Sequence, residues 1–152
     1  MQHMFGIKMV WAGWTDDRDT VGFSPHYHGM FKNAILSGTR MLIYELETNG
    51  ENPSLRGRLR IVGEVKVNKD FYRDDLKAPT VQHPWLLGIE FCLRSTDIVH
   101  PLTAAQVQTV IGGNLIGQRG ESWRQITRED QYMTLRDMLT RGTTCPMPIL
   151  NG

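Results

Sequence analysis

The chain has 152 residues, of which 40% are hydrophobic, and this is the usual size of one domain with a single core. Its formal net charge of +1 excludes a global electrostatic signature of nucleic-acid binding, so any basic surface has to come from local clusters. No apolar run approaches the roughly 18 residues of a membrane span, the N-terminus lacks a signal-peptide pattern, and the two cysteines are too far apart for a zinc motif. We therefore expect a cytoplasmic protein without a membrane partner.

The first part of the chain predicts two strands separated by a helix. Residues 5–13 are apolar and favour a strand, and residues 22–25 favour a loop. Over residues 27–36 the apolar side chains recur at helical spacing, which predicts a helix that ends near Gly38. Residues 41–46 predict the second strand.

The middle of the chain predicts two further strands. Residues 58–67 alternate between apolar and charged side chains, which is typical of a half-buried antiparallel strand. The expected inner face holds Leu59, Ile61, Val65 and Val67, and the expected outer face holds Arg58, Arg60, Glu64 and Lys66. Gly63 suggests a bulge where a small barrel bends. A charged loop over residues 70–83 and a strand over residues 85–93 follow.

Two helices and a short strand are predicted toward the C-terminus. Residues 103–106 form a capping-box pattern that starts a short helix, and Gly112 ends it. Residues 123–126 favour a short strand. The final helix has a buried stripe of Tyr132, Leu135, Met138 and Leu139.

Together these elements predict the α+β class: a small, mostly antiparallel, partly closed barrel flanked by helices. A βαβ array fits less well, because no crossover helix separates the middle strands. We expect one domain over residues 5–141 and a flexible tail over residues 142–152.

The order of the short motifs along the chain resembles the EVE family, a branch of the PUA-like fold related to YTH domains. The resemblance covers roughly residues 5–139, and it depends on the ordered set more than on any one motif. The matching segments are Val10-Trp11-Ala12-Gly13-Trp14, Val21-Gly22-Phe23, Lys32-Asn33, Thr39-Arg40-Met41-Leu42-Ile43-Tyr44, Ile61-Val62-Gly63-Glu64-Val65, His83-Pro84-Trp85, Pro101-Leu102, Gln118-Arg119-Gly120-Glu121-Ser122 and Ile126-Thr127.

The resemblance implies a PUA-like fold and a non-catalytic module that binds nucleic acid, either DNA or RNA, with a modified base in an aromatic pocket. It implies no cofactor and no metal. EVE- and YTH-like modules also occur at the N-termini of McrB-type restriction systems, so a role as part of a larger multidomain system is compatible with it.

Aromatic side chains at loops and strand edges are the candidates for the base pocket, because a flipped base needs flat apolar faces on either side. Trp85 is the first candidate, followed by Trp14 and Phe23. Asn33 and Ser122 could hydrogen-bond to the edge of the base. The same aromatics are also compatible with an ordinary core, and the two polar residues with local capping.

Basic residues cluster in two places and could contact phosphates. The candidates for the nucleic-acid backbone are Arg58, Arg60, Lys69, Arg73 and Arg119. A solvated charged face is the competing interpretation, because acidic residues are interspersed.

Two alternatives belong to other functional classes. His26 and His28 form a His-x-His pair that, with a third ligand, could bind a metal in a metal-dependent enzyme. The pair lies where a loop enters a helix, however, so the two rings are expected to point apart. A protein-interaction domain that uses the exposed aromatics is the other alternative. No catalytic set emerges from the serines, cysteines or acidic pairs, so we predict no enzyme activity.

Overall fold

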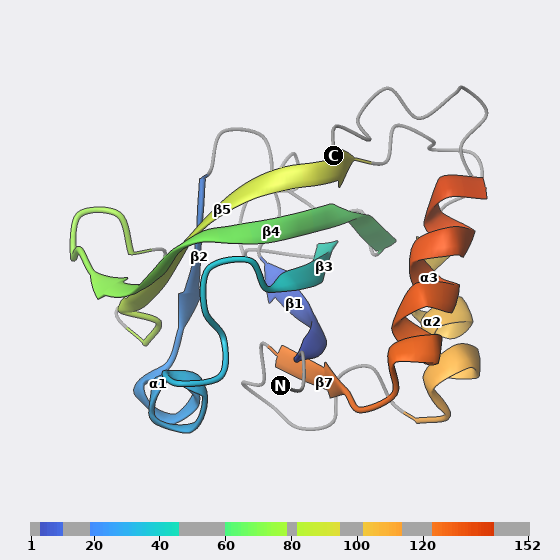
Figure 1. The fold of residues 1–152 in the computed structure, drawn as a ribbon, viewed down its shortest axis with the longest axis horizontal. Coiled ribbons are helices and arrows are strands. Elements are labelled where there is room, and N and C mark those ends of the chain that lie inside the picture. The colour runs from blue at the N-terminus through green and yellow to red at the C-terminus, as the bar shows by residue number, and fades with distance from the viewer. Residues whose placement is uncertain are drawn as a thin grey trace, which may run out of the picture.

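The computed structural model describes residues 4–10, 19–45, 60–78, 82–94, 102–113 and 123–141. These residues form one sheet and three helices of the α+β class (Figure 1). In chain order the elements are β1 (Phe5–Val10), β2 (Thr20–Phe23), α1 (Pro25–Phe31), β3 (Arg40–Glu45), β4 (Arg60–Arg73), β5 (Trp85–Arg94), β6 (Leu102–Thr103), α2 (Ala104–Ile111), β7 (Trp123–Ile126) and α3 (Glu129–Arg141).

The sheet is mixed and follows the strand order β2-β5-β4-β3-β1-β7, with β6 paired to β4. β1 and β3 are parallel, a pairing that the sequence did not predict. After β1 the chain forms β2 at the far edge of the sheet. It then returns through α1 and enters β3, which lies beside β1 and runs in the same direction. The structure therefore shows a curled mixed sheet, and among the described residues no pairing joins β2 to β7 to close it.

A bulge beside Gly63 bends β4, as the sequence predicted. The β3–β4 register shifts between Ile43 and Tyr44, and the β4–β5 register shifts just after Glu64. A Cβ atom at Gly63 would collide with the carbonyl oxygen of Leu93, so glycine lets the two strands approach. The bulge also makes the predicted faces of this strand wrong, because it sends Ile61 and Val65 to opposite faces of the sheet.

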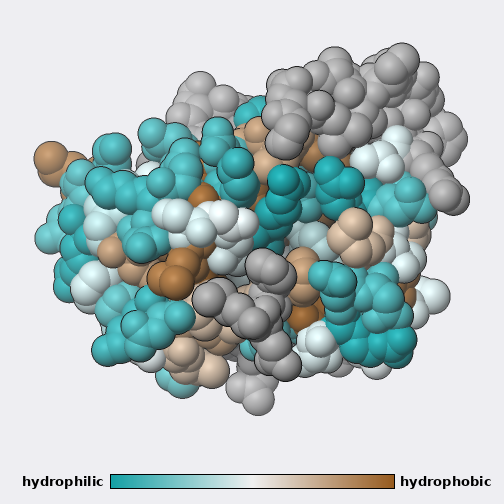
Figure 2. All heavy atoms as spheres, in the orientation of Figure 1, coloured by the Kyte–Doolittle hydropathy of each residue, from teal (hydrophilic) through white to brown (hydrophobic). Residues whose placement is uncertain are grey.

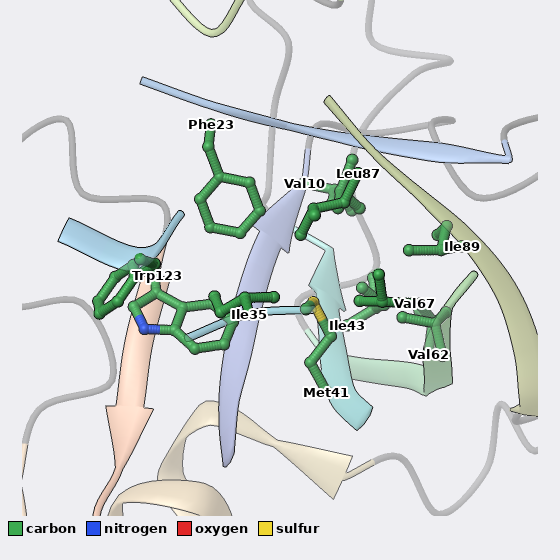
Figure 3. Close-up of a cluster of buried hydrophobic side chains, with 13 residues drawn as sticks. Val10, Phe23, Ile35, Met41, Ile43, Val62, Val67, Leu87, Ile89 and Trp123 are labelled. Carbon is green, nitrogen blue, oxygen red and sulfur yellow. The ribbon is translucent and has the colours of Figure 1, made fainter. Parts of the chain in front are cut away.

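Two hydrophobic clusters occupy the two faces of the sheet. The outer cluster lies under α2 and α3 and consists of Ile7, Met9, Leu42, Tyr44, Ile61, Leu93, Leu102, Val107, Ile126, Tyr132, Leu135 and Leu139. The inner cluster (Figure 3) consists of Val10, Val21, Phe23, Phe31, Ile35, Met41, Ile43, Val62, Val65, Val67, Leu87, Ile89 and Trp123. It lies inside the curl, because Phe23 of β2 and Trp123 of β7 contact each other from the two ends of the strand path.

Three strand predictions need correction. Residues 20–23 form β2 and not a loop, because all four are buried and pair with β5. Residues 70–73 belong to β4 and not to a charged loop, because Tyr72 and Arg73 pair with the start of β5. Glu64 was expected on a solvated face, but it is completely buried.

The helix ends follow the local chemistry of the sequence. The predicted capping box of α2 is present, with Thr103 and Gln106 bonded reciprocally, and Gly112 ends the helix at a φ of 73°. Along α3, Tyr132, Leu135 and Leu139 are buried, as predicted. In the described part of the chain, no helix has the length and apolar character to cross a membrane. Hydrophilic side chains cover much of the face seen in Figure 2.

Candidate functional site

The candidate site is centred on Trp85, the first residue of β5. In the sheet register Trp85 lies between Phe23 of β2 and Arg73 of β4, so the three residues form one row across three strands. Trp85 is half-buried and packs against the inner cluster. The Arg73 guanidinium carbon lies 5.5 Å from the centre of the indole ring, within reach of a cation–π contact.

His28 of α1 stacks on Trp85. The two ring centres are 3.6 Å apart and the ring planes differ by 3°, which is a parallel stack at van der Waals contact. Ser24 caps the start of α1 by accepting a hydrogen bond from the Tyr27 amide, and Pro25 occupies the first turn. Burial and then the nearby Lys32 charge lower the pKa of His28, so the stacked imidazole is neutral at neutral pH.

Ring contacts continue from this stack into the interior of the curl. The edge of Phe71 contacts His28, with centres 5.2 Å apart, and also Phe23, at 5.4 Å. Phe23 then contacts Trp123 at 5.8 Å (Figure 3). Phe31 of α1 reaches the same indole at 5.9 Å. The half-buried Trp85 is therefore the outer end of an aromatic series whose inner members are buried.

The sequence-based reasoning missed a buried lysine on the inner face. Lys8 of β1 is 2% exposed, and its Nζ donates to the Met9 carbonyl oxygen at 3.2 Å. The same Nζ lies 4.8 Å from the centre of the Phe23 ring. Burial lowers the pKa of Lys8 to about 7. The signal was present in the sequence as a single lysine inside the apolar strand Phe5–Val10.

His83 links Lys8 to the region of Trp85. It precedes β5 by two residues, and burial together with the Lys8 charge lowers its pKa to about 4. The Lys8 Nζ lies over the Phe23 ring, so these two side chains lie on the same side of the sheet, and the Lys8 charge acts on His83.

The five residues predicted for the base pocket have different positions. Trp85 is half-buried in the stack described above. Phe23 is 0% exposed, so it supports the row from inside and offers no free face. Asn33 is exposed in the turn that follows α1. Trp14 and Ser122 lie outside the described residues.

Of the five predicted backbone contacts, Arg73 lies beside Trp85, and Lys69 lies farther along β4, opposite Gly88 of β5. Lys69 and Arg73 are both exposed on β4; Lys69 Nζ lies 4.0 Å from the centre of the Tyr72 ring, and Arg73 pairs with Asp75 at 3.3 Å. Arg60 begins β4, but its side chain lies outside the described part, as do Arg58 and Arg119. The pair with Asp75 is exposed and is therefore weak enough to exchange for a phosphate.

The predicted His-x-His pair lies on α1. His28 stacks on Trp85 and His26 contacts the Tyr27 ring at 5.4 Å. Within the described ranges, no group of three or more histidine, cysteine, aspartate or glutamate side chains is placed to hold a metal ion.

This arrangement is similar to the fold of solved YTH-domain structures and of THYN1. The YTH domain of Mmi1 in complex with RNA superposes with a TM-score of 0.62 at 9% identity, over 92% of this chain and 79% of that chain. Atu2648 from Agrobacterium tumefaciens superposes with a TM-score of 0.56 at 14% identity, over 98% of this chain and 96% of that one. Human THYN1, in complex with DNA containing 5-methylcytosine, gives a TM-score of 0.55 at 14% identity, over 89% and 97%.

No family model matches the sequence, and no curated protein matches it significantly. The similarity to the solved structures therefore shows the fold and confirms the predicted resemblance to it, whereas the predicted mostly antiparallel barrel is confirmed only as a curled mixed sheet of the α+β class. The function has to be argued from the residues of this chain.

Proposed function

We propose that the protein is a non-catalytic nucleic-acid binding module that accepts a modified base at Trp85. The neighbours with this fold include a YTH domain bound to RNA and THYN1 bound to DNA with 5-methylcytosine. The proposal for this chain depends on its own aromatic site and basic side chains.

The stack of His28 on Trp85 is the observation that carries the proposal. Its separation of 3.6 Å and its parallel planes match the geometry by which a nucleobase stacks on an aromatic side chain. One face of the indole therefore accepts a planar ring, which in this structure is the imidazole of His28. Such a stack contributes about 1–3 kcal/mol for each base.

The neighbouring residues supply the other parts of a base site. Arg73 lies beside the indole, where its charge can meet a phosphate of the same nucleotide. Phe23 fixes Trp85 from the adjacent strand. We propose that Asn33 and Ser122 hydrogen-bond to the edge of the base and that Trp14 completes the aromatic pocket. Lys8 is a further hydrogen-bond donor on the inner face.

The backbone of the nucleic acid would follow the exposed basic side chains of β4. Lys69 and Arg73 project from the part of β4 that pairs with the start of β5. We propose that they contact phosphates together with Arg58, Arg60 and Arg119. Such contacts position the strand and make the affinity fall as salt rises.

The finer description of the fold belongs to the same proposal. We propose that the curled sheet is a PUA-like barrel over residues 5–141, since Phe23 and Trp123 already meet across its open side.

The experiment is a titration followed by tryptophan fluorescence. Short single- and double-stranded oligonucleotides, with and without methylated cytosine or adenine, are added at two salt concentrations. We expect quenching that is strongest for one modified base and weaker at the higher salt. The absence of quenching by every oligonucleotide at low salt would remove the proposed function and leave the fold intact.

Matched variants locate the site. Trp85→Leu keeps an apolar side chain but removes the flat ring, so it should reduce affinity by at least about tenfold. Lys69→Gln should weaken binding to all sequences equally and reduce the salt slope by about one. Lys66→Gln is the control, because Lys66 lies on the same strand and pairs with Glu90 at 3.9 Å. If Lys66→Gln and Lys69→Gln behaved alike, the phosphate path along β4 would be wrong.

A further inference from the structure

In this structure, the stacking face of Trp85 is already covered by an aromatic ring of the same chain. We infer that His28 is an internal competitor for this face, and that it lowers the affinity of every planar ligand that stacks there. The inference rests on the proposed function, because it concerns the affinity of the same site. It assigns His28 a role opposite to that of a wall that holds the base.

The geometry leaves no space for a second ring on that face. Ring centres 3.6 Å apart are in van der Waals contact, and the planes are parallel within 3°. A base stacked on the indole at the usual distance would occupy the volume that the imidazole fills. His28 therefore has to leave before the base can stack on this face.

Of the two rings that flank Trp85, Phe23 and His28, His28 is the one that can move. Phe23 on the adjacent strand is completely buried in the inner cluster. His28 lies on a surface helix and is held in place by Trp85 and by the edge of Phe71. The backbone of α1 is fixed by the Ser24 cap at one end and by the bond from the Lys32 amide to the His28 carbonyl at the other. Rotation of the His28 side chain therefore opens the site while the helix stays in place.

Competition with His28 has a consequence for affinity. A ligand gains only the difference between its own stacking on Trp85 and the stacking that His28 gives up. Displacing the imidazole costs a purine and a pyrimidine the same free energy, so His28 lowers the affinity for both by the same factor. The wild-type protein and a variant without the imidazole should therefore prefer one base over another to the same extent.

The first experiment tests the occupied face without any nucleic acid. N-methylnicotinamide, a planar quencher of indole fluorescence, is titrated into the wild-type protein, His28→Ala and the double variant His28→Ala/Trp85→Leu. We expect His28→Ala to increase quenching and the double variant to lose this increase. His26→Ala is the matched control, because its ring lies on the same helix and contacts Tyr27. Equal quenching in the wild-type protein and His28→Ala would overturn the inference.

The second experiment measures the competition directly. Short single-stranded oligonucleotides that carry one adenine or one cytosine in a constant sequence are titrated into the wild-type protein and His28→Ala. We expect His28→Ala to bind both about three to ten times more tightly, and by the same factor for adenine and cytosine. Weaker binding by His28→Ala would show that the imidazole is a wall of the pocket and not a competitor.

The two experiments separate the two proposals. If no oligonucleotide binds any variant but the quencher reaches Trp85 only after His28 is removed, the proposed nucleic-acid function fails and the occupied face stands. If oligonucleotides bind and Trp85→Leu abolishes binding, while His28→Ala changes neither affinity nor quenching, the proposed function stands and the competitor role of His28 fails.

Discussion

Glu64 and Lys8 are buried on opposite faces of the curled sheet, and the surroundings of the two charges differ. On the outer face, Glu64 of β4 accepts hydrogen bonds from Tyr132 Oη at 2.7 Å, Arg136 Nε at 2.9 Å and Arg40 Nη1 at 3.3 Å. On the inner face, the Nζ of Lys8 donates to one backbone carbonyl and lies over the Phe23 ring. The first charge has charged and polar partners from two elements, β3 and α3, whereas burial without a compensating charge dominates the surroundings of the second.

The comparison separates a structural site from a functional one. Hydrogen bonds to Glu64 connect β3 and β4 to α3, so this charge holds the helix against the sheet. Burial lowers the pKa of Lys8 to about 7, and within the described structure Trp123 Nε1, opposite Lys8 in the β1–β7 register, has no hydrogen-bond partner, as is the case for Arg124 Nε next to it. Incompletely satisfied polar groups are expected where a ligand supplies the missing partners. The outer face therefore stabilises the fold, and the inner face carries the candidate site.

The largest predicted effect comes from neutralising Glu64. Glu64→Gln leaves the guanidinium groups of Arg40 and Arg136 without their anion, at a place where Glu64 itself is completely buried. We expect the free energy of unfolding to fall by about 3 kcal/mol. Urea denaturation followed by circular dichroism measures this change.

Glu90→Gln is the matched control for this variant. Glu90 pairs with Lys66 at 3.9 Å, and the two side chains are 54% and 38% exposed. We expect a loss of at most about 1 kcal/mol. Similar losses in the two variants would break the distinction between a structural buried charge and an ordinary ion pair.

The next effect is the loss of one donor to Glu64. Tyr132→Phe keeps the ring in the outer cluster and removes the hydroxyl that donates to the carboxylate. Burial and the Glu64 charge raise the pKa of Tyr132, so the hydroxyl is protonated and donates across the neutral range. We expect a loss of about 2 kcal/mol in the same urea experiment. No change in stability would mean that the two arginines alone satisfy Glu64.

The local features of both faces could be predicted from the sequence. The capping box at Thr103, the stop at Gly112 and the buried stripe of α3 depend on residues within a few positions of each other. Gly63 marked the bulge for the same reason, since glycine inside a strand is itself a signal. These features belong mainly to the outer face, whose role is to stabilise the fold.

The features of the inner face depend on contacts between distant segments. The sequence nominated Trp85, but it could not show that His28 stacks on it, because this contact depends on the pairing of β2 with the distant strand β5. Phe23 was placed in the pocket because it follows a loop-like glycine, whereas pairing of β2 with β5 buries it completely. The lysine in β1 was visible in the sequence, but its burial follows from the neighbouring strands on both sides.

A smaller effect of opposite sign is expected at Lys8. Lys8→Met keeps an unbranched side chain of similar length and removes the amine that burial disfavours in its charged form. We expect the variant to be more stable than the wild-type protein by about 1–2 kcal/mol at pH 7 and to bind oligonucleotides less tightly.

The pH dependence checks the cause of this effect. Because the folded pKa of Lys8 is about 7 and the unfolded value is 10.5, the unfolded chain binds more protons between these values. The stability of the wild-type protein should therefore rise relative to that of Lys8→Met as the pH rises from 7. A destabilised Lys8→Met variant would mean that the lysine has a structural role like that of Glu64.

The smallest effect is expected from His83 in acid. Its folded pKa is about 4 and its ordinary value is 6.5, so between these values the unfolded chain takes up a proton that the folded chain does not. Stability is therefore lost as the pH falls from about 6.5 toward 4. Because His83 is only partly buried, we expect the wild-type protein to lose about 1 kcal/mol more than His83→Gln between pH 7 and pH 5. Urea denaturation at the two pH values measures the difference, and the comparison between variants cancels the carboxylates that titrate in the same range. Equal losses would mean that folding does not lower the pKa of His83, and therefore that neither burial nor the Lys8 charge acts on this side chain.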